Sequence, residues 1–132
     1  MFANNVVIAV PDGTTTTYGL LSVVGSSSQR GNAAAPIGAP DLFRISHEIS
    51  GKGDAAVDRH LIRVDLTKEI DGETTGVRRR ATASAYVVLV VPHSVVTKDD
   101  VREAFNRVKT FLNSTEDGAS SDNLERVLNS EP

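Results

Sequence analysis

The sequence predicts an α+β fold in which an antiparallel sheet comes first and helices follow. Strand-like alternation runs up to Val91, and helical periodicity begins only after Thr97. Between them, Pro92 directly follows the longest β-type run, Ala81–Val91. The 132 residues fit one domain, with a hairpin in 1–25, a sheet in 41–91 and helices in 97–130.

The first quarter of the chain predicts a β-hairpin and a long loop. The short apolar run Val6–Val10 ends in Pro11-Asp12-Gly13, a combination typical of tight turns. Thr15–Val24 is rich in β-branched residues and forms the second arm, which Gly19 is expected to weaken or bulge. Gly25–Pro40 has no period, so we expect a loop in which a short edge strand can hide.

Three longer strands follow as an antiparallel meander. Asp41–Ser50, Arg59–Ile70 and Ala81–Val91 each alternate, and the turns between them are rich in glycine. Alternation assigns one apolar face to Phe43, Ile45, His47, Ile49, Ile62, Val64, Leu66, Ala83, Ala85, Val87, Leu89 and Val91. The opposite face is polar, except that Val88 and Val90 make the last strand apolar on both sides, which predicts burial there.

The helical part predicts one long and one short helix. Thr97 can cap a helix over Lys98–Leu112, and Asp99 and Asp100 suit its first turn. Asp122 can start a second helix carrying Leu124, Val127 and Leu128 on one side. The long helix has an apolar stripe, from which we predict a dimer interface at Val101, Phe105, Val108, Phe111 and Leu112.

These helices are too little cover for a sheet of this size. One helix of about four turns cannot roof the predicted apolar face by itself. Either the sheet is small, or a second copy of the chain brings two more helices. An intertwined homodimer would solve the problem, and it would also protect an open edge strand.

Composition excludes several function classes. The net charge is -3, from 14 basic and 17 acidic residues, so nucleic-acid binding would need positive charge gathered on one face. There is no cysteine, the three histidines lack metal-site spacing, and no nucleophile motif is present. We therefore predict no enzyme activity, no metal and no cofactor. The sequence has neither a signal-peptide pattern nor an apolar run long enough to span a membrane, and a cytoplasmic origin is the default.

The order of elements resembles the coat proteins of single-stranded RNA bacteriophages, the leviviruses. The resemblance covers nearly the whole chain, with the closest local matches at Arg59–Glu69 and Tyr86–Phe105. It implies an intertwined homodimer whose helices cover the partner's sheet, and an icosahedral shell assembled in the bacterial host cytoplasm. It also implies that the polar sheet face binds single-stranded genomic RNA inside the virion, with stem-loop recognition that represses translation. The loop before the last strand, Asp71–Val77, would make contacts around the symmetry axes.

Carried onto this chain, the resemblance assigns an RNA-binding face to nine residues of the meander. They are Arg44, Ser46, Glu48, Ser50, Arg63, Asp65, Thr67, Ser84 and Tyr86. Arginines would neutralise phosphates, hydroxyls would donate to phosphates or base edges, and Tyr86 could stack on an unpaired base. The sequence departs from the family at Leu61, where a polar residue is usual, and the carboxylates of Glu48 and Asp65 add negative charge.

Each of these assignments has a plainer alternative. Arg78-Arg79-Arg80 is either an RNA contact or a solvated strand start. Tyr86 is either a stacking platform or a half-buried sheet tyrosine. Arg63 and Asp65 are either phosphate-binding or an ordinary same-face ion pair, and His47 is expected to be a satisfied core histidine. For the whole chain, the alternative is a cellular dimeric module that binds a small ligand or peptide on its open sheet face.

Overall fold

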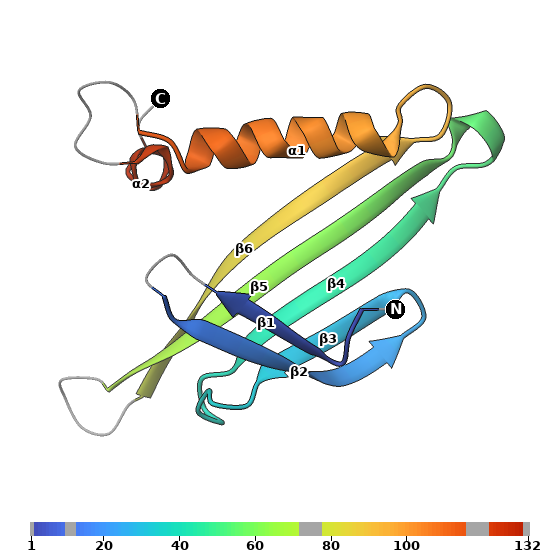
Figure 1. Cartoon of the computed structure of the whole chain (residues 1–132). Coiled ribbons are helices and arrows are strands. Elements are labelled where there is room, and N and C mark those ends of the chain that lie inside the picture. Colours follow the sequence, from blue (N-terminus) through green and yellow to red (C-terminus); the bar gives the residue numbers. More distant parts are fainter. Residues whose placement is uncertain (1, 10–12, 72–77, 116–121, 131–132) are drawn as a thin grey trace.

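The computed structural model describes residues 2–9, 13–71, 78–115 and 122–130, which form one sheet and two α-helices (Figure 1). Along the chain the elements are β1 (Asn5–Ala9), β2 (Thr15–Val24), β3 (Ser27–Asn32), β4 (Asp41–Ser50), a 3-10 turn (Gly53–Ala55), β5 (Val57–Asp71), β6 (Arg78–Pro92), α1 (Lys98–Leu112) and α2 (Asn123–Leu128). The predicted α+β class, with the sheet first, is confirmed. Pro11, Asp12 and the predicted symmetry-axis loop at 72–77 lie outside the described residues.

The sheet is a six-stranded antiparallel meander in which each strand pairs with its neighbour in the chain. Two details of the prediction are wrong. The strand within the predicted loop is β3, which lies between β2 and β4 instead of at an edge. The irregularity in β2 falls between Leu20 and Ser22, not at Gly19, because Leu21 is the residue left out of register. The last strand also includes Pro92, whose position at the sheet edge needs no ladder hydrogen bond.

Side chains in the register confirm the predicted division into two faces. Phe43 pairs with Val64, which pairs with Ala85, and Ile45, Ile62 and Val87 form the next row on the same face. We call this the apolar face, and its opposite the polar face. Figure 1 shows β1 and β2 turned at an angle to β4–β6. They bring the side chains of Tyr18, Val6 and Ile8 onto the apolar face.

The core sits where this N-terminal hairpin meets the apolar face. Tyr18, Phe43 and Ile45 are its buried residues, and the Tyr18 and Phe43 rings lie 5.6 Å apart. The Tyr18 hydroxyl donates to Asp41 at 2.8 Å, which satisfies the polar tip of the buried ring. Arg30, only 2% exposed, also lies here and donates to the Ser28 hydroxyl and the Ala3 carbonyl. The core is small for a sheet of this size.

Both helices begin where the sequence predicts. The Thr97 hydroxyl accepts from the Asp100 amide, and the Asp100 carboxylate accepts from the Thr97 amide, which is a complete capping box. Asp122 caps α2 by accepting from the Glu125 amide. Asn123 is buried between the helices and donates to the Phe111 carbonyl. No described helix is long and apolar enough to cross a membrane.

The helices cover little of the chain's own sheet. Figure 1 shows α1 extending along the β6 side, away from β1 and β2, with α2 at its far end. α1 packs against β6 and α2, and none of its residues is buried. On the apolar face, Ile62, Leu66 and Val87 remain exposed. One chain therefore leaves much of its apolar face open, as the shortage of helices predicted.

Candidate functional site

The nine residues assigned to RNA binding all lie on the polar face of β4, β5 and β6. The register aligns Arg44 with Arg63 and Tyr86 in one row, and Asp65 with Ser84 in the next. The remaining residues on this face are Ser46, Glu48 and Ser50 on β4 and Thr67 on β5. Strand alternation alone had predicted this shared face, and the register now gives the neighbours within it.

The row containing Arg44, Arg63 and Tyr86 is the centre of the face. Arg44 and Arg63 are direct cross-strand partners, an arrangement of like charges that is unfavourable unless an anion lies between them. The guanidinium of Arg44 donates to the Gln29 side chain at 3.2 Å. Tyr86 continues the row onto β6 and is 66% exposed, so its ring is open to solvent. Two adjacent guanidinium groups beside an exposed ring could hold a phosphate and a stacked base.

Arg63, Asp65 and Ser84 form a hydrogen-bonded cluster next to this row. The Arg63 Nε lies 2.8 Å from Asp65 Oδ1, and the Ser84 hydroxyl donates to the same oxygen at 2.5 Å. The Ser84 hydroxyl, and then the Arg63 guanidinium, hold the pKa of Asp65 below its ordinary value. The same-face ion pair that the sequence allowed is therefore present. A second Arg63 nitrogen donates to Ser84 at 3.2 Å, so the cluster orients this guanidinium.

The other assigned residues are more ordinary in their surroundings. Glu48 lies opposite Arg59, so its charge has a cross-strand counterpart. The Thr67 and Thr82 hydroxyls lie 3.0 Å apart, and Ser46 faces Leu61, the apolar departure that the sequence showed. Sequence reasoning missed Gln29, Arg59 and Thr82 on this face. Arg59 follows from alternation with Arg63, whereas Gln29 could not be found because β3 had been taken for a loop.

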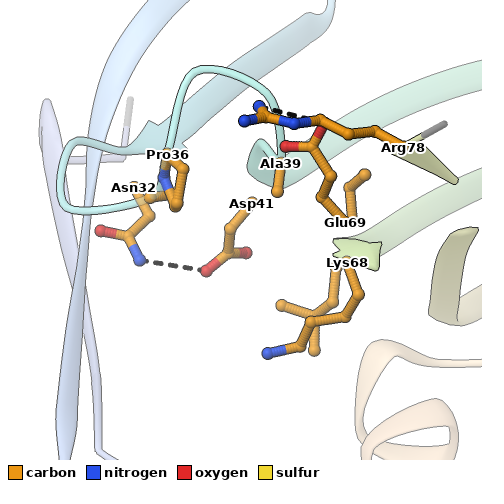
Figure 2. Close-up of a pocket in the computed structure, with 10 residues that line it drawn as sticks. Asn32, Pro36, Ala39, Asp41, Lys68, Glu69 and Arg78 are labelled. Atoms are coloured by element: carbon orange, nitrogen blue, oxygen red, sulfur yellow. Dashed lines mark hydrogen bonds and ion pairs between the residues drawn. The ribbon is translucent and has the colours of Figure 1, made fainter. Parts of the chain in front are cut away.

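The arginine triplet is divided between the two faces. Arg78 and Arg80 lie on the same face as Glu69 and sit 3.8 Å and 3.6 Å from its carboxylate, while Arg79 pairs with Ile70 on the other face. Glu69 and Arg78 also line a 520 Å³ pocket between the 33–40 loop and β5. Figure 2 shows two polar pairs lining it: Arg78 lies beside Glu69, and the Asn32 amide donates to the Asp41 carboxylate.

A second candidate surface, with exposed apolar side chains, lies between α1 and β6. These elements form an open groove of 860 Å³, lined by α1 and by β6 from Tyr86 to Val90, whose side chains alternate between the two faces. Four of the five residues predicted at the dimer interface line it, namely Val101, Phe105, Val108 and Leu112. Phe111 instead lines a separate hollow on another side of α1, with Asn106 and Thr110. Val108 is 56% exposed, so this groove is largely empty of the chain's own side chains.

The three histidines do not form a metal centre. Among the described residues, no group of three or more histidine, aspartate or glutamate side chains could hold a metal ion. His47 does lie on the apolar face and is satisfied by His60, as expected, but it is exposed in the single chain instead of belonging to its core. His93 lies 2.9 Å from Asp58, beside the end of β6.

Solved structures with the same architecture cover this chain almost completely. A virus-like particle of bacteriophage AVE019 has a TM-score of 0.76 and 11% identity, with 100% of this chain and 98% of that chain covered. A virus-like particle of Beihai levi-like virus 21 has a TM-score of 0.72 and 10% identity, with 100% of this chain and 97% of that chain covered. The bacteriophage GA capsid protein has a TM-score of 0.63 and 16% identity, with 98% of this chain and 95% of that chain covered. The chain has the coat-protein fold of these phages.

The likeness extends over every element of the chain. Both helices and all six strands are included, since the alignments leave almost no residue uncovered. The sequence itself matches no protein-family model and none of the curated proteins. Identities of 10–16% explain this, because alternating and helical apolar patterns can be met by many sequences. The levivirus-like layout read from the sequence is thus confirmed at the level of the fold.

Proposed function

We propose that this chain is a capsid subunit that dimerises, assembles into an icosahedral shell and binds single-stranded RNA on the polar face. The observation that carries the proposal is a fold shared end to end with proteins of phage capsids and virus-like particles. Its role is structural and not enzymatic, and its location is the virion after assembly in the bacterial cytoplasm.

The uncovered surfaces support an intertwined homodimer. β6 ends the sheet, and no strand among the described residues pairs with its outer edge. The groove beside it is lined by valine, leucine and phenylalanine side chains. A second copy would pair its β6 with this edge and place its α1 over the open apolar face. Pairing two such copies would remove the β6 edge of each copy from water and give each α1 a second sheet to pack on.

RNA binding is supported by the row of Arg44, Arg63 and Tyr86. Placing two guanidinium groups directly opposite each other costs free energy in the empty protein, and a phosphate between them would reverse the sign of this interaction. Asp65 is already paired with Arg63, and Glu48 has Arg59 opposite it on β5, so both carboxylates have a basic neighbour other than Arg44. Stem-loop recognition with translational repression is the finer form of this proposal, with Tyr86 stacking on the unpaired base.

Electron microscopy of the purified recombinant protein tests the capsid role. We expect uniform closed shells, on the order of tens of nanometres across, with nuclease-protected RNA inside. A small dimer that never assembles at any protein or RNA concentration would contradict the capsid role and favour the ligand- or peptide-binding module.

A matched pair of variants tests the RNA face. Arg44→Gln should lower the RNA content of the shells and reduce the salt dependence of RNA binding by about one phosphate contact. Arg102→Gln removes an exposed charge from α1 and should leave both unchanged. Equal RNA content in both variants would remove the polar face from the proposal while leaving the shell in place.

A further inference from the structure

His47 and His60 form a close pair on the apolar face. They are direct partners across β4 and β5, with their Nδ1 atoms 2.9 Å apart and their rings nearly perpendicular at 72°. One Nδ1 must donate and the other accept, since two protonated nitrogens cannot share a hydrogen bond. This hydrogen bond can therefore form when both rings are neutral, or when one ring is protonated and the other is neutral. A second added proton would turn it into two cations in contact.

The surroundings of the pair are apolar and already contain a positive charge. Ile45, Ile62 and Leu89 flank it on the same face. His47 also lines a 210 Å³ cavity together with Arg30, the fully buried arginine. Arg30 donates hydrogen bonds to neutral oxygens on Ser28 and Ala3. Once a second copy covers the pair, added protons would lie in an apolar site next to a cation, where charge is costly.

One described carboxylate lies beside the pair on this face, that of Asp58 on β5, two residues from His60. Its Oδ1 lies 2.9 Å from His93 Nε2, so His93 competes for it. Glu48 and Arg59 belong to the opposite face, and β6 places Leu89 next to His60. The groove along α1 contains Asp100 and Lys109, but Thr97 holds the Asp100 carboxylate in the capping box.

We propose that the His47–His60 pair is an acid-sensitive release for the contact between two copies of this chain. The inference rests on the proposed homodimer, in which the second copy's helices cover the apolar face. Covering the pair would remove water from both imidazoles, so the dimer would bind fewer protons than two separate chains. Dimer stability then falls as pH falls through the range in which histidine gains charge, about pH 8 to 5. With only two nitrogen ligands, the pair is suited to a proton and not to a metal ion.

Subunit exchange between isotope-labelled and unlabelled dimers, followed by native mass spectrometry, measures this release. For the unaltered chain, exchange should accelerate about tenfold between about pH 7.5 and pH 5.5. The double variant His47→Gln/His60→Gln keeps donor and acceptor groups but cannot take up charge, so its exchange should be nearly independent of pH. Asp58→Asn/His93→Gln is the matched control, because it removes the third histidine together with the carboxylate it contacts and leaves the pair intact.

The outcomes separate this inference from the proposed function. Absence of any dimer at about pH 7.5 would contradict the homodimer itself, and the inference with it. A dimer whose exchange rate is the same at both pH values would overturn the inference alone. So would an acid response that survives in the His47→Gln/His60→Gln variant or disappears in the Asp58→Asn/His93→Gln control. Each single variant, His47→Gln and His60→Gln, should already flatten the response, which guards against a double variant that fails to fold.

Discussion

The two ends of the sheet differ in how much of their apolar surface the chain itself covers. Next to the N-terminal hairpin, Tyr18, Phe43 and Ile45 are buried by the chain's own strands. At the β6 edge, by contrast, Val88 and Val90 stay exposed, and α1 has no buried residue although its stripe faces β6. We call the first region, formed by Tyr18, Phe43 and Ile45, the finished core. We call the second region, the groove between α1 and β6, the half interface. Apolar surface of the second kind is unusual on a monomer, and it points to a second copy.

Breaking the half interface should have the largest effect. Phe105→Glu puts a charge into the groove between α1 and β6, where a partner's apolar side chains would surround it. We expect the dimer dissociation constant to rise by about a thousandfold or more, with loss of shells, as measured by analytical ultracentrifugation and electron microscopy.

Asn106→Glu is the matched control, because it adds the same charge on the side of α1 that faces a separate hollow. It should leave the dimer intact. If Phe105→Glu gave a soluble, folded dimer like the control, α1 would pack only on its own sheet and the contrast between the two regions would fail.

Breaking the finished core should act on folding instead of association. Phe43→Ala removes the central ring of the Tyr18–Phe43–Ile45 cluster and should lower the free energy of unfolding by about 3 kcal/mol. Chemical denaturation at several protein concentrations measures it. The concentration dependence of the midpoint should match that of the unaltered chain, whereas a changed dependence would mean that Phe43 also contributes to the interface.

Much of this architecture could be predicted because it depends on local patterns. β2, β4 and α1 have the predicted bounds, since β-branched residues, strict alternation and a capping box mark them in turn in the sequence. For β3 the sequence predicted only a short edge strand somewhere within the loop, because SSQRGN has no alternation of apolar and polar residues. Its strand conformation comes from hydrogen bonding to β2 and β4 on both sides, which is a tertiary effect.

For the candidate site, too, the sequence predicted what depends on local patterns and not what depends on strand pairing. Period-two alternation placed nine residues on one face, but only the register brings Arg44 opposite Arg63 and Tyr86. The same holds for His47 and His60, which are 13 residues apart in the chain and meet only because β4 pairs with β5 in this register. The missed Gln29 follows directly from the missed β3.

The hydroxyl of Tyr18 offers a pH test of the finished core. Burial, and then the hydrogen bond to the Asp41 carboxylate, raise its pKa from 10.0 to about 12. Unfolded chains lose this proton first, so the contribution of Tyr18 is present below pH 10 and is lost as pH rises toward 12. In a Tyr86→Phe variant, tyrosinate absorbance should therefore appear only near pH 12.

The accompanying loss of stability should be about 2 kcal/mol across that pH range. Tyr18→Phe has no hydroxyl to ionise, and its alkaline loss of stability should be smaller by this amount. A tyrosinate midpoint near the ordinary value of 10.0 in the Tyr86→Phe variant would show that the hydroxyl is not enclosed by the core.

The smallest expected effect concerns the first turn of α1, at its N-terminal end in the half interface. Thr97→Ala removes the hydroxyl that accepts from the Asp100 amide, and it should destabilise the first turn by about 1 kcal/mol. Because α1 has no buried residue in one chain, its first turn depends on the capping box more than a buried helix would. Hydrogen exchange of the amides at 98–101 should accelerate, while exchange in β4 stays unchanged. Thr110→Ala makes the same substitution inside α1, where alanine is the better helix former, and should not accelerate it. Equal exchange in both variants would mean that contacts with the second copy, and not the cap, hold this turn in place.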